Sequence, residues 1–313
     1  MNRRLRPYAR AALRVWSRTG LRHGWFYRVM EAYGPGLAEA EAIPSRLPTG
    51  QTIACDLRDH VQRHLYFQGA YEPLEAYVFH RLLRPGMTVV DAGANVGQYT
   101  LLASAGVGPT GRVHAFEPVP ATFARLERHV ADAGATNVVL HRAALWREAG
   151  SLRLGLPDGA TDNVGSFAVN PEGEIAGASI RFDDLVREAA VGPVGLVKMD
   201  IEGAEVAALA GMAEMLGRDR PILLLEVNRA ALGRLDAAPR DLWAVLVDGL
   251  GYSAWSIGVG GWRPAASADG IVQENVLFIP GPLPMTVADA CRLRPALRWA
   301  GSGGERAASG ASS

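Results

Sequence analysis

One apolar stretch, VGLVKMDIEGAEVAAL at residues 194–209, holds the side chains whose chemistry is easiest to interpret. Lys198 is the only lysine among the 32 lysine and arginine residues of the chain, and it lies just ahead of Asp200. Because an isolated buried charge is costly, Lys198 should lie beside a carboxylate, with Asp200 or Glu226 as the first candidates. One explanation for a lysine in place of an arginine at this position is a tight pocket that excludes the wide guanidinium group, and chance placement is the alternative.

Acidic or amide side chains also close several segments that have the pattern of strands. In a parallel sheet the carboxyl ends of the strands share one edge, where ligands bind. Lys198 is two residues before Asp200, so both should point to the same face. Glu202 remains open between a functional role and helix capping, whereas Glu205 is assigned to capping, since acids in a first turn favour the helix dipole. The strand-end residues are Asp91, Glu117, Asp200, Glu226 and Asn228.

A glycine turn in VVDAGANVGQYT follows the first of these strands. Gly93 and Gly97 let the backbone approach a ligand, although a purely structural turn is the competing account. The turn is not G-x-G-x-x-G, because Ala94 and Asn95 follow Gly93, and this disfavours a nicotinamide dinucleotide. Asp91 at the entry suits a cationic ligand better than a phosphate.

Glu117 closes the next strand and can accept hydrogen bonds from both hydroxyls of a ribose. The glycine turn and the strand-end acid together indicate a nucleoside with free ribose hydroxyls. With Asp91 added, they indicate a nucleoside that carries positive charge, as S-adenosylmethionine does.

The motifs VVDAGANVGQYTLLA, GRVHAFEPVPATFARLERHV, VKMDIEGAEVAAL and PILLLEVN together resemble the FkbM family of S-adenosylmethionine-dependent methyltransferases. FQGAYEP and NVLFIP resemble that family too, and the resemblance covers roughly residues 65–280. It implies methylation of a hydroxyl oxygen, commonly on a sugar, a glycan or a secondary metabolite. Alternatives from the residues themselves are a nicotinamide-dependent oxidoreductase and a non-catalytic nucleoside-binding protein.

The resemblance also implies roles for individual residues. Glu117 takes the ribose, and Ala143 and Ala144 lie along the adenine. From position alone, Glu72 either reaches the amino group of the cofactor or caps the following helix. Asp200, at a strand end, is expected to face the transferred methyl and the acceptor hydroxyl, with Lys198 and Glu226 as the other candidate catalytic residues. The residues expected to line the methionine end are Asp91, Gly93, Asn95 and Gly97.

A divalent metal is conceivable at Asp200, Glu226 and Asn228, because magnesium prefers oxygen ligands from adjacent strand ends. The position is similar to the metal site of catechol-type O-methyltransferases. The Glu-x-Asn pattern differs from that site, so a metal is not favoured. The polar segment Thr161–Ser166 is a further candidate for contact with the cofactor or the acceptor.

Strand-like and helix-like patterns alternate five times between the ends of the chain, which predicts a parallel sheet with helices on both faces. YSAWSI and NVLFIP, joined through GVGGW, predict a closing antiparallel hairpin. With the resemblance, the fold expected is the Rossmann-like, doubly wound α/β sheet of class I methyltransferases with an N-terminal helical extension. The predicted strands are Met87–Asp91, Arg112–Pro118, NVVLHRAAL, GLVKMD and PILLLEVN.

The composition, 49% hydrophobic and 20% charged over 313 residues with zero net charge, indicates a globular protein and gives no sign of a nucleic-acid partner. Cys55 and Cys291 form no zinc spacing or disulfide framework, so we expect a reducing, cytoplasmic compartment. No segment has the pattern of a secretory signal or a membrane span. We divide the chain into an extension (1–45), a methyltransferase domain (46–285) and a tail (286–313) that is disordered at its end.

Residues 1–30 contain eight arginines and no acid. Five arginines recur every fourth residue from Arg6 to Arg22, opposite an apolar face that includes Tyr8, Val15 and Trp16. Such a helix either contacts anionic lipid or docks on the main domain with its arginines in water.

Overall fold

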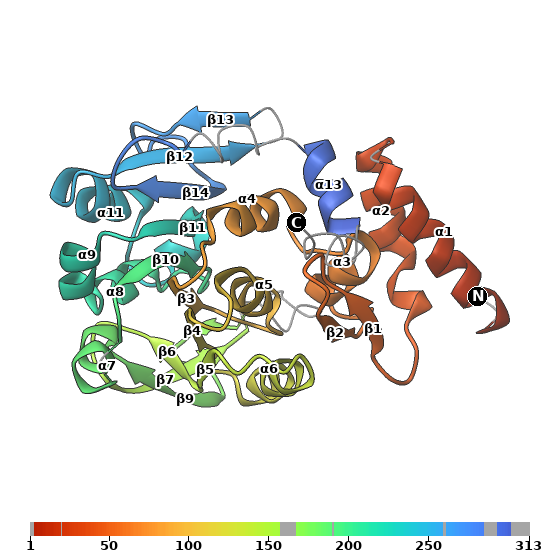
Figure 1. Cartoon of the computed structure of the whole chain (residues 1–313), viewed down its shortest axis with the longest axis horizontal. Helices are drawn as coiled ribbons and strands as arrows, with labels where there is room; N and C mark the ends of the chain where they lie inside the picture. Colours follow the sequence, from red (N-terminus) through yellow and green to blue (C-terminus); the bar gives the residue numbers. More distant parts are fainter. Residues whose placement is uncertain are drawn as a thin grey trace, which may run out of the picture.

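An eight-stranded sheet runs through the computed structural model, with helices on both faces (Figure 1). The structure describes residues 3–19, 21–156, 167–189, 191–258, 261–284 and 293–301. The strand order is β13-β12-β14-β11-β10-β3-β4-β5, and each neighbouring pair is hydrogen-bonded. This arrangement confirms the predicted α/β class with a mostly parallel, doubly wound sheet.

Five parallel strands form the centre of the sheet, as the alternating pattern predicted. β3 lies between β10 and β4, and its Asp91 is level with Lys198 of β10. Because side chains alternate between the two faces, Val89 packs with the helices on one side and Val90 with those on the other. The bounds are β3 Thr88–Ala92, β4 Arg112–Phe116, β5 Val138–His141, β10 Val194–Met199 and β11 Ile222–Asn228.

Three further strands extend the sheet beyond β11: β12 Ser253–Gly258, β13 Gly261–Pro264 and β14 Gln273–Ile279. β14 pairs antiparallel with both β11 and β12, which confirms the predicted antiparallel edge. The two strands predicted as a hairpin pair antiparallel as β12 and β14, and their connection contains a strand that was not predicted, β13, which pairs with the outer side of β12. The chain then returns and inserts β14 between β12 and β11, where its apolar side chains are buried on both faces.

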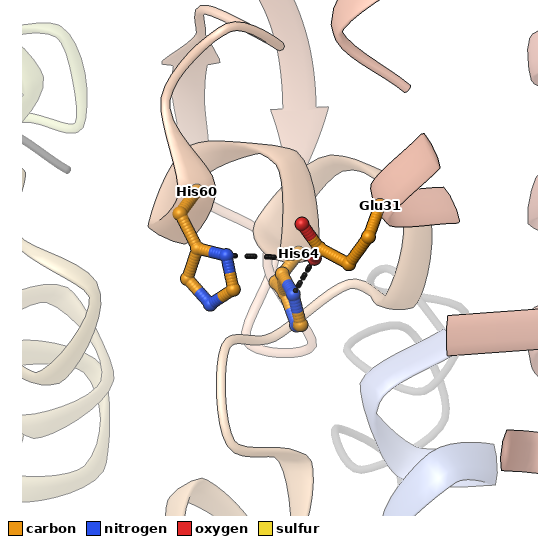
Figure 2. A group of neighbouring side chains, drawn as sticks. All are labelled: Glu31, His60 and His64. Carbon is orange, nitrogen blue, oxygen red and sulfur yellow. Dashed lines mark hydrogen bonds and ion pairs between the residues drawn. The ribbon is translucent and has the colours of Figure 1, made fainter. Parts of the chain in front are cut away.

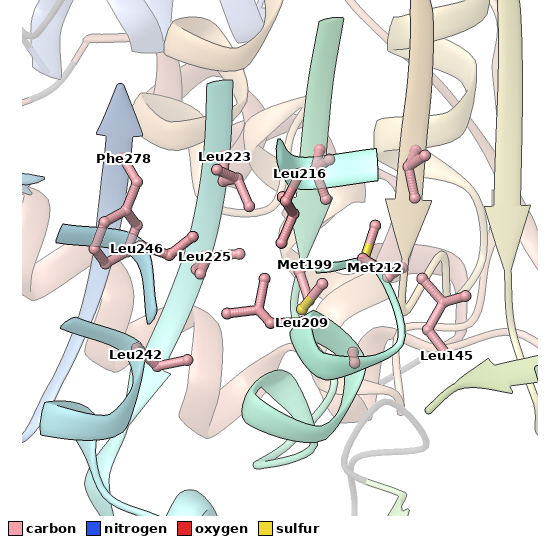
Figure 3. Packing of buried hydrophobic residues seen from close by; sticks show 14 of the residues in the cluster. Leu145, Met199, Leu209, Met212, Leu216, Leu223, Leu225, Leu242, Leu246 and Phe278 are labelled. Atoms are coloured by element: carbon pink, nitrogen blue, oxygen red, sulfur yellow. The ribbon is translucent and has the colours of Figure 1, made fainter. Parts of the chain in front are cut away.

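Helices cover the sheet in two layers. One layer contains α4 Pro73–Leu82, α5 Gln98–Val107 and α13 Leu293–Gly301, and the other α7 Phe182–Ala189, α8 Glu205–Ala210, α9 Ala213–Asp219, α10 Arg229–Gly233 and α11 Pro239–Trp243. Figure 3 shows Leu223 and Phe278 of the strands packed with Leu216, Leu242 and Leu246 of the second layer. Burial of these apolar side chains is the main source of stability for such an arrangement.

Two segments with a continuous helix-like sequence pattern are interrupted in the structure. GAEVAALAGMAEML divides into α8 and α9, because Gly211 lies against another backbone: a Cβ on it would be 2.0 Å from the carbonyl oxygen of Trp146. RDLWAVLVDGLG begins as α11 and continues as a π-helical turn over Ala244–Gly249.

A second sheet of four strands, in the order β6-β9-β7-β8, lies outside the sequence prediction. Its strands are β6 Ala143–Leu145, β7 Gly150–Gly155, β8 Ala168–Val169 and β9 Ile175–Ile180. NVVLHRAAL, predicted as one strand, therefore divides at Arg142 into β5 of the main sheet and β6 of the second sheet. In IRFDDLVREAA the chain passes from the last residue of β9, Ile180, into α7, and the rest of β9 lies before this segment. Thr161–Ser166 lies outside the described residues.

The N-terminal part contains α1 Arg6–Thr19, α2 His23–Tyr33, the hairpin of β1 Ile43–Arg46 and β2 Thr52–Cys55, α3 His60–Gln68, and a share of the core cluster that includes α6 Pro120–Asp132. The extension is docked, with Arg6 and Arg10 of α1 facing inward, whereas Arg18 and Arg22 are exposed. Arg6 donates to the carbonyl of Ala38 (2.7 Å), and Arg10 donates to the carbonyl of Leu37 (3.0 Å). Their stems cover apolar surface while their guanidinium groups bind backbone oxygens. Consequently Tyr8 and Val15 are exposed at 75% and 63%.

The segment assigned to the C-terminal tail contains a helix, α13, which packs on α4 and on α1 (Figure 1). Trp299 of α13 stacks on His80 of α4, with ring centroids 5.2 Å apart. Residues 302–313 and Cys291 lie outside the described part, and the domain boundaries after residues 45 and 285 stay predictions. In the described ranges, no helix has the length and apolar character needed to cross a membrane.

At the turn after β3, two backbones pack closely. Gly93 has φ +79°, and a Cβ on it would lie 1.9 Å from the carbonyl oxygen of Asp200. Gly97 has φ +99°, and a Cβ there would lie 2.8 Å from Leu126 Cδ1. Gly93 thus allows the end of β10 to approach the end of β3.

Replacement of Gly93 by alanine should therefore destabilise the fold more than replacement of Gly86. Gly86 has a nearly identical φ of +80°, but its nearest atom to a Cβ, Thr110 Oγ1, is 3.7 Å away. Both changes strain the backbone, whereas only Gly93→Ala adds a clash, so we expect it to lose at least about 2 kcal/mol more. Urea unfolding of both variants measures this difference, and equal losses would show that the close approach is relaxed in solution.

Candidate active site

A cavity of about 400 Å³ lies at the carboxyl ends of the central strands. Of the residues expected to bind a cofactor or act in catalysis, six line its wall: Gly93, Asn95, Glu117, Ala144, Asp200 and Glu226. The others, Glu72, Asp91, Gly97 and Lys198, are not part of the wall. Most of the candidates predicted from the sequence therefore lie in the wall of one cavity, and the remaining four do not line it.

Glu117 lies at the end of β4 and is buried. Its Oε2 accepts the backbone N–H of Asn95 (3.0 Å), and its Oε1 accepts that of Val119 (2.9 Å). Burial raises the pKa of Glu117 to about 7, against the lowering effect of these two hydrogen bonds. Each carboxylate oxygen still has one lone pair, so Glu117 can accept further hydrogen bonds from hydroxyls in the cavity.

Asp91 and Gly97 have structural positions behind the wall. Asp91 accepts a hydrogen bond from the Thr100 hydroxyl at 2.6 Å, which ties β3 to α5. Burial raises the pKa of Asp91 to about 6, while Thr100 and Lys198 act to lower it. Gly97 precedes α5 and packs against Leu126. Neither Asp91 nor Gly97 lines the cavity, in contrast to the expectation that both line the methionine end.

Lys198 is buried, with 1% of its side chain exposed, and its Nζ lies 3.5 Å from Asp200 Oδ2. This confirms the prediction of a buried lysine paired with a carboxylate. The ammonium also lies over the ring of Tyr99, at 5.1 Å from the centroid. Burial by itself would lower the pKa of Lys198, but Asp200, Glu72, Glu226 and other carboxylates raise it above its ordinary value. The lysine is therefore a cation that holds acidic groups around it.

Glu226 is the second acid at this end of the cavity. Its Oε1 accepts a hydrogen bond from Gln273 Nε2 at 2.7 Å, from the neighbouring strand β14. Burial and the adjacent charge of Asp200 raise the pKa of Glu226 to about 9. At neutral pH, Glu226 is consequently a neutral carboxylic acid that can donate a hydrogen bond.

Glu72 lies immediately before α4 with φ 48° and ψ 67°. The capping alternative for this residue is wrong, because its side chain makes no hydrogen bond to the start of α4. Its Oε1 instead accepts from Asn275 Nδ2 at 3.2 Å, and its buried Oε2 has no hydrogen-bond partner among the described residues. Burial raises the pKa of Glu72 to about 8, while Lys198 acts to lower it.

The remaining strand-end residues have other partners. The side-chain oxygen of Asn228 accepts the N–H groups of Ala230 and Ala231, both at 3.1 Å, and so caps α10 instead of facing a metal. Glu205 accepts the N–H of Ile201 at 3.1 Å, in the turn before α8, so its hydrogen bond closes that turn and does not cap the helix. Glu202 lines the cavity and pairs with Arg234 at 3.6 Å.

Residues from the N-terminal half complete the wall, and the sequence analysis did not identify them. Gln98 accepts the N–H of Tyr71 (2.7 Å) and donates to its carbonyl (3.0 Å), which fixes the FQGAYEP segment over the cavity. His60 on α3 is also part of the wall. In the sequence, only the FQGAYEP motif indicated that this part of the chain reaches the cavity, because α3 carries no recognisable motif. His80 and His141 do not line the cavity.

Comparison with known proteins places these features in a family. The family described as "Methyltransferase FkbM domain" matches residues 91–254. The chain is 31% identical to the 31-O-demethyl-FK506 methyltransferase FkbM of Streptomyces tacrolimicus, over 54% of this chain and 75% of that protein. It is 32% identical to the hexuronic acid methyltransferase AglP of Haloferax volcanii, over 40% of this chain and only half of that protein. A crystal structure of a methyltransferase FkbM from Methylobacillus flagellatus KT has 17% identity and a TM-score of 0.41, covering 70% of this chain and 55% of that one.

Glu226 should make the stability of the protein depend on pH. Its pKa is about 9 in the folded chain, against an ordinary value of 4.5, so the folded state holds a proton that the unfolded state releases. This stabilisation is complete below about pH 4.5 and is lost as the pH rises towards 9. The free energy of unfolding of the wild type should fall relative to Glu226→Gln by up to about 1.4 kcal/mol per pH unit in this window.

Urea titrations at a series of pH values measure this difference. Glu127→Gln, on the exposed face of α6, is the control and should follow the wild type at every pH. Parallel pH profiles for the wild type and Glu226→Gln would contradict the assigned protonation of Glu226.

Proposed function

Because this chain belongs to the FkbM family of methyltransferases, we propose that it methylates a hydroxyl oxygen of a sugar, a glycan or another polyhydroxylated metabolite. Membership of the family makes the chain an S-adenosylmethionine-dependent methyltransferase, so the oxidoreductase and non-catalytic alternatives are rejected. The names of two relatives, one for 31-O-demethyl-FK506 and one for a hexuronic acid, support an oxygen acceptor on a hydroxyl-rich molecule.

The cavity has features that fit S-adenosylmethionine, which supplies an electrophilic methyl carbon when bound. Glu117 is buried at the end of β4 with unused lone pairs, a suitable partner for the ribose hydroxyls. Ala144 gives a small apolar wall beside it, where a larger side chain would narrow the space for adenine. The acids on the wall, among them Asp200 and Glu202, favour a ligand with positive charge.

The observation that carries the proposal is the buried Lys198 beside Asp200 at the open end of β10. An alcohol is a poor nucleophile while it keeps its proton, so a group near the acceptor must receive that proton. We assign this role to the carboxylate of Asp200, which lines the cavity and whose side chain is 31% exposed. Lys198 positions this carboxylate, and the protonated Glu226 can donate a hydrogen bond to the acceptor. Alignment of the acceptor supplies most of the remaining effect.

Replacement of Asp200 by asparagine should lower kcat by about 100-fold or more, because the amide keeps the shape of the side chain but does not accept the proton. Transfer of a labelled methyl group from S-adenosylmethionine to a glycan extract, followed by mass spectrometry for one added methyl, measures the activity. Binding of S-adenosylhomocysteine by calorimetry should change less than threefold.

The Asp56→Asn variant, which removes the ion pair of a partly exposed carboxylate with Arg58 away from the cavity, is the control. Wild-type turnover by Asp200→Asn would disprove the role of Asp200. Failure of the wild type to methylate any hydroxyl-bearing acceptor, with transfer to nitrogen or carbon instead, would disprove the acceptor class.

We also propose that the docked extension contacts an anionic membrane, which would bring the enzyme to an acceptor on a lipid carrier. α1, α2 and the turn between them expose apolar side chains, and exposed arginines accompany them within residues 1–30, which contain no acid. Aromatic and basic side chains together suit the lipid–water interface. The cytoplasmic, membrane-peripheral location stays a prediction. The exposed apolar residues are Leu5, Tyr8, Val15, Leu21, Trp25 and Tyr33, and the arginines include Arg18, Arg22 and Arg28.

Vesicle sedimentation tests this contact. The wild type should bind vesicles with anionic lipid and not neutral vesicles, and the double variant Tyr8→Ser, Trp25→Ser should lose at least about two thirds of the bound fraction. Val272→Ser, which removes a 71% exposed side chain elsewhere, should bind as the wild type does. Equal binding of the wild type and the double variant would contradict the proposal.

A further inference from the structure

A cluster of three potential metal ligands lies where the N-terminal extension meets the methyltransferase domain (Figure 2). Glu31 comes from α2, and His60 and His64 come from α3. Glu31 Oε1 is 2.7 Å from His64 Nε2 and 3.4 Å from His60 Nδ1. Among the described residues, this is the one place where three histidine, cysteine or acidic side chains bring ligand atoms within 4.8 Å of one another.

The spacing of the two histidines suits coordination of one ion. His60 and His64 are four residues apart on a helix, so their rings project from the same face and lie 4.4 Å apart between centroids. Zinc binds imidazole nitrogen and carboxylate oxygen at about 2.0–2.2 Å, which places neighbouring ligands about 3–4 Å apart. The three atoms are already close to this separation, and small side-chain rotations suffice to surround an ion.

Second partners already orient two of the ligands. The Tyr27 hydroxyl oxygen lies 3.1 Å from His64 Nδ1, so it can accept a hydrogen bond from the Nδ1–H group when Nε2 binds a metal. Arg63 donates to Glu31 Oε2 at 2.6 Å, which fixes the carboxylate and leaves Oε1 for the ion. The positive charge of Arg63 weakens the site relative to a structural zinc site but does not occupy the ligand atom.

The cluster borders the cavity rather than lying deep in the fold. His64 is buried, whereas the side chains of Glu31 and His60 are each 34% exposed. His60 is part of the cavity wall. Three protein ligands with solvent access leave a further coordination position for water or another oxygen, as in catalytic rather than structural zinc sites.

We propose that Glu31, His60 and His64 form a binding site for a divalent transition metal ion, with Zn²⁺ as the reference ion. Two imidazole nitrogens and one carboxylate select such an ion over Mg²⁺ or Ca²⁺, which prefer oxygen ligands alone. The ion joins α2 to α3 and so fixes the extension at the edge of the cavity. Any contact of the ion with an acceptor rests on the proposed function, whereas its binding does not.

Metal titration of the full chain tests the site. After removal of metals with a chelator, the wild type should bind about one equivalent of Zn²⁺ by calorimetry, and Co²⁺ should give visible absorption typical of four or five ligands. His60→Ala and Glu31→Gln should each weaken Zn²⁺ binding at least tenfold. His80→Ala, which removes a half-buried histidine of another helix with no acidic partner, is the matched control and should bind as the wild type does.

The same titration separates this site from chance binding. A change of less than threefold in both His60→Ala and Glu31→Gln, or an equal loss in His80→Ala, would overturn the proposal. X-ray absorption of the zinc-loaded wild type gives a readout that needs no variant. Two imidazole nitrogens in its spectrum would support the site, and their absence would refute it. Both measurements are made without S-adenosylmethionine or acceptor, so their result is independent of the proposed function.

Discussion

A buried positive charge at the end of β10 sets the electrostatics of the active-site end of the sheet. Lys198 is 1% exposed and has one ion-pair partner within 4 Å among the described residues, Asp200. An uncompensated ammonium in this position would cost several kcal/mol, by the order of magnitude known for buried ions. The fold therefore requires acids close to Lys198, and the strand ends that deliver them are the same ends that form the cavity.

The acids outnumber the cation, and this excess determines their protonation. Asp200, Glu72, Glu226 and Asp91 all lie within electrostatic reach of Lys198. One ammonium does not balance four neighbouring carboxylates, so protonation of some of them is favoured. The raised pKa values of Glu226 and Glu72, about 9 and about 8, express this constraint. A carboxylate next to a neutral carboxylic acid gives the site both a proton acceptor and a hydrogen-bond donor.

The N-terminal segment is part of the site as well as an extension of the domain. Tyr71 and Gln98 hold each other through two hydrogen bonds, and His60 lies in the cavity wall. Arg6 and Arg10 of α1 donate hydrogen bonds to the backbone carbonyls of Ala38 and Leu37, and α1 packs on α3. Docking of this segment thus affects the shape of the cavity, and it also brings Glu31 beside the two histidines of α3.

The sequence by itself determined the parallel centre of the sheet, because short apolar runs alternate there with helix-like segments. It also determined that Lys198 is buried against Asp200, since the cost of an unpaired buried charge holds in any fold. The second sheet was not predictable, because β6 continues the pattern of β5 and only packing divides them at Arg142. The split of α8 from α9 has the same kind of cause, the contact of Gly211 with the backbone at Trp146. Tertiary structure alone placed Glu72 beside Asn275 and turned Arg6 and Arg10 of α1 inward, because these contacts join residues far apart in the chain and leave no local pattern.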